Sequence, residues 1–158
     1  MPISDPLAAG TRPRRPNATP HAARNVRPVR RRQPPTLDEA FDADTLVRLR
    51  AAVAAYLNTV GAGSAIDDIV LAAHELCGNA VKHGGGSGRL RMWREDDRIL
   101  CRVIDLGPGM ADRTDGGLEP PPPNAIGGRG LWIVRRLADV YIDTGPHGTT
   151  VTAAITIR

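Results

Sequence analysis

Two side chains in the middle of the sequence have the types and spacing to bind a metal ion and accept a proton. Glu75 and Asn79 lie four residues apart, so on a helix with 3.6 residues per turn both project from one side. Mg²⁺ usually takes one or two protein oxygens and completes its octahedron with water and phosphates. The pair therefore suits a magnesium–nucleotide site with Asn79 as metal ligand and Glu75 as base. A solvated polar face is the alternative for the pair in isolation.

A second candidate is a carboxylate at the end of an apolar segment. Asp105 follows residues 99–104 and needs donors or water to offset its desolvation. An exocyclic amine is one such donor. Gly107 and Gly109 lack Cβ atoms and would let a flat ring approach the backbone closely, while Pro108 stiffens the turn. An ordinary Asp-Gly turn is the alternative.

The third candidate is a pair of glycines before an apolar-periodic segment. Gly128 and Gly130 flank Arg129, at the expected start of a helix. The unpaired N–H groups and the dipole of a helix N-terminus favour phosphate. A flexible hinge is the alternative for the glycines, and Arg129 could either contact phosphate or face solvent.

The segments that carry these residues are predicted to be helices and antiparallel strands. Apolar residues recur at three- and four-residue steps up to Gly61, and again after Ser64, which with Asp67 is predicted to form a capping box. Helices are expected over 44–60, 65–83 and 130–138, and strands over 36–41, 89–94, 99–105, 140–144 and 149–157, with 106–126 irregular. This pattern predicts an α+β fold, a two-layer α/β sandwich whose mostly antiparallel sheet is covered by helices on one face.

Length and composition narrow the classes of protein. A chain of 158 residues with 41% hydrophobic and 3% aromatic residues predicts one domain with a core of Ala, Val, Leu and Ile. The apolar runs are too short for a membrane helix, and the first ten residues lack the apolar region of a signal peptide. Two cysteines exclude a disulfide framework and a four-cysteine zinc site. A reduced, cytoplasmic protein without membrane contact is expected.

Positive charge is concentrated at the N-terminus. Residues 1–35 hold eight arginines, one aspartate and eight of the 14 prolines, whereas residues 36–158 hold 13 basic and 16 acidic side chains. Such a segment buries too little apolar surface to offset its chain entropy. We therefore expect a disordered basic tail over 1–35 and one globular domain over 36–158. The tail either contacts nucleic acid or an acidic partner, or is a solvated leader.

The order of the three clusters resembles the Bergerat-type ATP-binding domain of gyrase-like ATPases, sensor histidine kinases and anti-sigma-factor serine kinases. The similarity runs from about Thr36 to Arg158, and the small size most resembles the last group. Residues 75–84 match the N box, 105–109 the first glycine box and 128–131 the second. Three motifs in the family's order make the resemblance specific.

This resemblance implies ATP and Mg²⁺ as cofactors and a role for each site residue. Glu75 is the expected general base and Asn79 the magnesium ligand, while Asp105 accepts the adenine amino group. The remaining residues shape the pocket and its phosphate end: Gly107 and Gly109 at adenine, Lys82 or His83 near the phosphates, Gly128, Arg129, Gly130 and Leu131 in the phosphate-facing loop, and Thr149 supporting adenine directly or through water. Residues 111–126 become the ATP lid.

The same resemblance implies a regulatory serine/threonine protein kinase that binds a sigma factor and phosphorylates a small antagonist protein, and so regulates transcription. Serine-kinase relatives often carry charged residues before the second glycine box, whereas 124–127 is uncharged here. An ATP-gated protein-binding module without phosphoryl transfer is therefore the alternative. Nucleic-acid association through the tail and a homodimer stay open. His74-Glu75-Leu76 superficially resembles a histidine-kinase phospho-acceptor box, but such a box belongs on a separate helix ahead of the N box.

Overall fold

The computed structural model describes residues 37–110, 119–120 and 128–157. Predictions for the tail and for most of the ATP-lid segment fall outside these residues. The elements in chain order are β1 (Leu37–Asp42), α1 (Leu46–Thr59), the short 3₁₀ turn η1 (Gly63–Ala65), α2 (Ile66–His83), β2 (Ser87–Glu95), β3 (Arg98–Asp105), α3 (Arg129–Leu137), β4 (Asp139–Gly145) and β5 (Gly148–Thr156).

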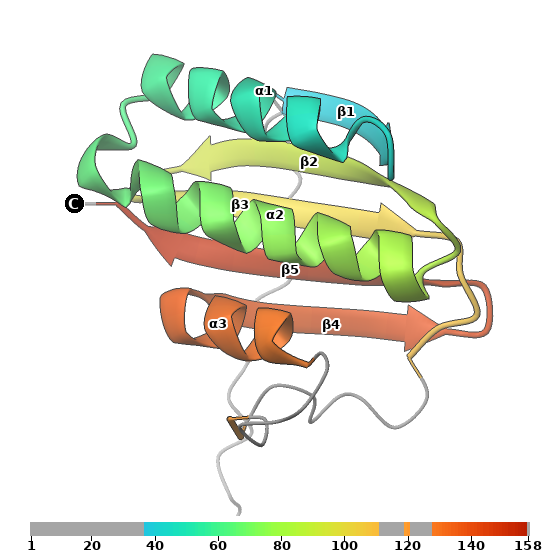
Figure 1. The fold of residues 1–158 in the computed structure, drawn as a ribbon. Coiled ribbons are helices and arrows are strands. Elements are labelled where there is room, and N and C mark those ends of the chain that lie inside the picture. The colour runs from blue at the N-terminus through green and yellow to red at the C-terminus, as the bar shows by residue number, and fades with distance from the viewer. Residues whose placement is uncertain (1–36, 111–118, 121–127, 158) are drawn as a thin grey trace, which may run out of the picture. The chain divides into compact units, whose positions relative to one another are not determined.

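The strands form one antiparallel sheet in the order β1-β2-β3-β5-β4. The three α-helices lie on one face of this sheet (Figure 1). Alternation along β3 places Ile99, Cys101 and Val103 in the core against the helices, while Arg102 lies on the other face, over the ring of Trp93. The predicted α+β sandwich with helices on one face is confirmed.

Helix α2 is the central helix of the covering layer and carries the first candidate pair. Its buried residues repeat at helical spacing: Ile69, Val70, Ala72, Ala73, Leu76, Cys77 and Ala80. Asp67 and Asp68 lie in its first turn and Lys82 and His83 in its last, which complements the helix dipole. Glu75 and Asn79 are half-buried at the edge of the apolar stripe, so they are not part of a fully solvated face.

The predicted capping box at Ser64 is wrong. Ser64 lies inside η1, α2 begins at Ile66 after Ala65, and no side-chain hydrogen bond caps the helix. An N-cap residue needs extended backbone angles, whereas the chain here is already turned before the helix starts. The predicted stop of α1 at Gly61 is confirmed, since α1 ends at Thr59 and Gly61 adopts a φ of +69°.

No helix within the described ranges is both long enough and apolar enough to span a bilayer.

Short polar contacts fix the start of α1. The Asp42 carboxylate accepts the backbone N–H groups of Asp44, at 3.0 Å, and Thr45, at 2.9 Å, as well as the Thr45 hydroxyl. Hydrogen bonds from Thr45 hold the pKa of Asp42 below its usual value. This carboxylate thereby ties the end of β1 to the first turn of α1.

Both cysteines are free and fully buried. Burial raises the pKa of the Cys77 thiol strongly and that of Cys101 to about 12. An unfolded thiol has a pKa near 8.5, so above about pH 9 the unfolded chain binds fewer protons than the folded chain. The free energy of unfolding must then fall with rising pH, by up to about 1.4 kcal/mol per pH unit for each thiol.

We therefore expect stability, measured by urea unfolding, to fall more steeply between pH 9 and 10.5 in the wild type than in a Cys77→Ala/Cys101→Ala variant. The variant is the control for lysines and tyrosines that titrate in the same range. Equal pH dependence of the two proteins would contradict the shifted thiols.

Candidate functional site

Several element ends lie near one another on one side of the sandwich. The C-terminal end of α2, the end of β3 and the start of β5 lie at the same end of the sheet, and α3 starts beside the middle of α2, where Gly130 faces Glu75 (Figure 1). A cavity between them is lined by five of the predicted site residues, Asn79, His83, Asp105, Leu131 and Thr149. The antiparallel pairing of β3 with β5 brings Asp105 opposite Thr149, and the helices packed on the sheet add Asn79, His83 and Leu131.

The Asp105 carboxylate is held from two directions. Its Oδ1 accepts the backbone N–H of Gly107 at 3.0 Å and that of Thr149 at 3.2 Å. The first bond is the local Asp-Gly turn of the alternative interpretation, and the second comes from β5. A Cβ on Gly84 would lie 2.5 Å from Oδ2, so glycine at the end of α2 makes room for the carboxylate. The charge is therefore fixed in a cavity wall, beyond what a turn alone requires.

The two glycines after Asp105 face protein backbone. A Cβ on Gly107 would lie 2.5 Å from the carbonyl carbon of Gly84. Gly109 has a φ of +83°, and a Cβ there would overlap the carbonyl oxygen of Gly145. Close chain packing thus explains why both positions are glycine, and their predicted contact with adenine stays a prediction.

Glu75 lies against the first turn of α3. A Cβ on Gly130 would overlap the Glu75 carboxylate oxygen Oε2, so Gly130 makes room for this side chain. Gly128 precedes α3 with a left-handed φ of +82°, a conformation that glycine adopts without strain. The first N–H groups of an α-helix have no partner within the helix itself, and the candidate base Glu75 lies beside the start of α3. The prediction that a helix starts at this glycine cluster is confirmed.

Seven of the predicted site residues are not among those that line the cavity: Glu75, Lys82, Gly107, Gly109, Gly128, Arg129 and Gly130. Lys82 and Arg129 are exposed at the end of α2 and the start of α3. Sequence reasoning also missed Met110 and Thr144. Thr144 Oγ1 lies 2.8 Å from the backbone nitrogen of Met110 and 2.9 Å from Thr149 Oγ1. The one signal for Thr144 is its position opposite Thr149 in the β4–β5 pairing, which requires the register of the hairpin.

The cavity is lined by polar groups that could bind a nucleotide, but it is narrow. It encloses about 20 Å³, which is the room for about one water molecule. A carboxylate, a hydroxyl and an amide surround it, next to the N-terminus of α3. These groups fit a purine base and its phosphates chemically, and Asn79 with Glu75 supplies the oxygens that Mg²⁺ prefers. Binding of a base requires neighbouring side chains to move apart.

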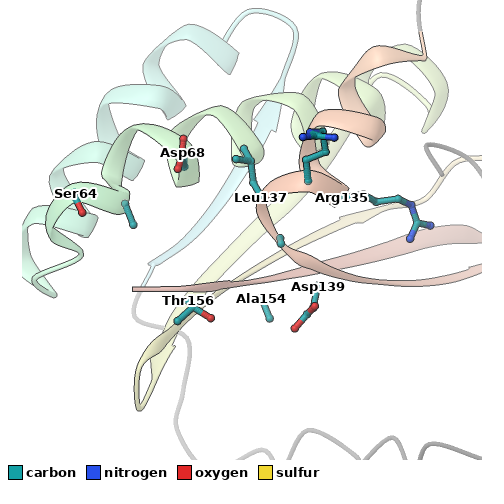
Figure 2. Close-up of a pocket in the computed structure, with 10 residues that line it drawn as sticks. Ser64, Asp68, Arg135, Leu137, Asp139, Ala154 and Thr156 are labelled. Atoms are coloured by element: carbon teal, nitrogen blue, oxygen red, sulfur yellow. The ribbon is translucent and has the colours of Figure 1, made fainter. Parts of the chain in front are cut away.

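A larger cavity of about 460 Å³ lies at the other end of α2 and α3. Figure 2 shows Ser64 and Asp68 from the α2 side, with Arg135 and Leu137 from the end of α3. None of the predicted site residues lines this cavity. Arginines and aspartates both line it, so it favours neither an anionic nor a cationic ligand.

Comparisons with known proteins agree with the predicted fold. Residues 40–155 match the histidine kinase-like ATPase domain family. The structure is similar to that of the Erythrobacter litoralis EL346 blue-light activated histidine kinase, with a TM-score of 0.50 and 20% identity over 71% of this chain and 42% of that one. It is also similar to the catalytic domain of histidine kinase ThkA, with a TM-score of 0.50 and 14% identity over 77% of this chain and 96% of that one.

A shorter match is to a small part of a longer signalling protein. The chain is 47% identical over 45 residues to the signal transduction histidine-protein kinase AfsQ2 of Streptomyces coelicolor. This stretch spans 28% of the chain and 8% of that protein. The match of 40–155, together with the five-stranded antiparallel sheet and its three helices, confirms the resemblance read from the three boxes. The chain belongs to the histidine kinase-like ATPase domain family, whose domains bind ATP.

Proposed function

We propose that this domain is a regulatory serine/threonine protein kinase of the anti-sigma-factor type, which transfers the γ-phosphoryl group of ATP to a small antagonist protein. The observation that carries the proposal is the Glu75 carboxylate, half-buried beside the first turn of α3. A serine hydroxyl needs a base to take its proton, whereas a neutral imidazole attacks with a free lone pair. A carboxylate in this position therefore supports a hydroxyl acceptor.

In this proposal the remaining residues keep the roles that the family resemblance implies. Asp105 accepts the amino group of the base, the N–H groups at the start of α3 bind phosphate oxygens, and the Asn79 amide oxygen would hold Mg²⁺. When bound, the metal neutralises charge on the phosphates. The serine oxygen attacks the γ-phosphorus, the bond from the γ-phosphorus to the bridging oxygen of ADP breaks, and Glu75 takes the hydroxyl proton.

The protein partners that we propose follow from the resemblance of the three motifs to those of anti-sigma-factor serine kinases. A sigma factor and its antagonist are the expected protein partners, and the arginine-rich residues 1–35 would add an electrostatic contact with nucleic acid. The ATP-gated binding module is the second candidate function, supported by the uncharged residues 124–127. A homodimer is compatible with either function.

The test follows radiolabelled γ-phosphate from ATP to candidate antagonists and sigma factors of the same cell. We expect the label on the acceptor protein to be stable in acid and to be released in base, because it is attached as a phosphoserine ester. Label that is lost in acid would identify phosphohistidine and overturn the serine assignment. Tight Mg²⁺–ATP binding without transfer to any candidate would favour the binding module.

Substitution of Gly130 tests the contact that positions Glu75. In Gly130→Ala the added methyl would displace the carboxylate, whose end is flexible, so we expect a stability change below about 1 kcal/mol but phosphoryl transfer about 10- to 100-fold slower. Gly78→Ala in α2 is the control, because nothing lies within 4 Å of a Cβ there. That change is expected to raise stability by about 0.5–1 kcal/mol. Urea unfolding and initial rates measure both effects, and an unchanged rate in Gly130→Ala would contradict the contact.

A further inference from the structure

The hydroxyl of Thr144 connects two parts of the site that are far apart in the sequence. Thr144 is the penultimate residue of β4, and its Oγ1 accepts the backbone N–H of Met110 at 2.8 Å. The same oxygen lies 2.9 Å from the hydroxyl oxygen of Thr149 on β5. Thr149 is 5% exposed and lines the cavity with Asp105. Thr144 itself is not among the residues that line this cavity.

The number of protons that each hydroxyl can donate indicates which of the two threonines is the donor in this hydrogen bond. A threonine hydroxyl donates one hydrogen bond and accepts two. Thr144 Oγ1 already accepts from Met110, and within the described residues the Thr149 oxygen is the protein acceptor for its proton, although the distance alone allows either hydroxyl to donate. The opposite direction would leave the proton of this part-buried hydroxyl without a protein acceptor among the described residues, which costs the free energy of one hydrogen bond. With Thr144 as the donor, the proton of Thr149 remains for a ligand in the cavity.

The result is an acceptor and a donor side by side in the cavity wall. The backbone N–H of Thr149 bonds to Asp105 at 3.2 Å, so the carboxylate acceptor and the hydroxyl donor are neighbours. A 6-aminopurine complements this pair, because its amino group donates and the ring nitrogens beside that group accept. A 6-oxopurine presents an acceptor where the amino group would be, opposite the carboxylate.

We propose that Thr144 is a positioning residue that orients the Thr149 hydroxyl as a donor, and thereby sets the preference of the site for 6-aminopurine over 6-oxopurine nucleotides. The inference rests on the proposed binding of ATP at this site. Thr144 acts through Thr149 and touches no ligand. Removal of its hydroxyl should therefore change selectivity between bases more than it changes the fold.

The experiment measures, by calorimetry with Mg²⁺, the affinities of ATP, GTP, 1-deaza-ATP and 7-deaza-ATP for the full chain. Wild type is expected to bind one of the two deaza analogues about tenfold more weakly than ATP, which identifies the nitrogen that Thr149 meets. Thr144→Val should lose about tenfold in ATP affinity, bind that analogue as well as ATP, and lose a similar factor of its ATP-over-GTP preference. Thr144→Ser restores the hydroxyl and should restore all three values.

Thr150→Val is the matched control. Thr150 follows Thr149 on β5, and successive side chains of a strand lie on opposite faces of the sheet, so this variant should behave as wild type. If Thr144→Val lowers the affinities for ATP and for both analogues by the same factor, Thr144 has a structural role only and the proposal is overturned. The proposal is also overturned if Thr144→Val still distinguishes ATP from the weaker-binding analogue as wild type does. If either of these results is obtained and the wild type binds ATP, the proposed function still stands. If the wild type binds no ATP, the proposed function itself is overturned.

Discussion

Replacement of Asp105 by asparagine is expected to weaken ATP binding by about 100-fold. The reason is the two backbone N–H groups, of Gly107 and Thr149, that point at Oδ1. If the amide oxygen of Asn stays in that place, its NH₂ group faces the amino group of the base. If the amide flips, the NH₂ group faces the two N–H donors. Either orientation sets donor against donor, and loss of a hydrogen bond to a charged group costs about 1.5–3 kcal/mol.

Calorimetric titration with Mg²⁺–ATP measures this effect, and urea unfolding shows whether the variant is folded. Asp143→Asn is the matched control, because Asp143 is an exposed carboxylate on β4 that the proposed site does not include. Unchanged ATP affinity in a folded Asp105→Asn protein would place the base elsewhere.

Glu75→Gln is expected to slow phosphoryl transfer by about 10²- to 10⁴-fold while ATP affinity stays within about threefold of wild type. Glutamine keeps the length and the shape that fit against Gly130, but it cannot take a proton from a serine hydroxyl. Binding depends on Asp105 and the start of α3, which this substitution leaves intact. The measurement compares the initial rate of label transfer with the dissociation constant of ATP.

Glu95→Gln is the control for the same chemical change, since Glu95 is exposed at the end of β2, away from the cavity lining. A Glu75→Gln protein that transfers phosphate at the wild-type rate would remove Glu75 from its catalytic role. A protein that binds no ATP would instead show that the carboxylate holds the site together.

The elements around the site were predictable because their apolar residues repeat with clear periods. The expected helix over 65–83 and strand over 99–105 differ from α2 and β3 by one residue at one end. The start of α2 was mispredicted because Ser64 has the right side chain for a cap but lies in a 3₁₀ turn. Backbone angles before a helix depend on how the preceding loop packs, and residue type reports them only indirectly.

The site was predictable to the extent that it is local. Spacing alone placed Glu75 and Asn79 on one side of a helix, and the apolar segment before Asp105 indicated a buried strand end. The contacts of Gly84 with Asp105 and of Thr144 with Met110 join segments 21 and 34 residues apart. Such contacts depend on the register of β3, β4 and β5, which no short motif encodes.

The pairing of β3 with β5 also determines when the site can form during folding. The hydrogen bond between Asp105 and Thr149 closes a loop of 44 residues, and the entropy of closing a loop rises only with the logarithm of its length. A nascent chain that has not yet reached β5 therefore carries Asp105 without its partner. Doubling the loop would add only about 0.6 kcal/mol, so insertions within it can vary in length at little cost to the site.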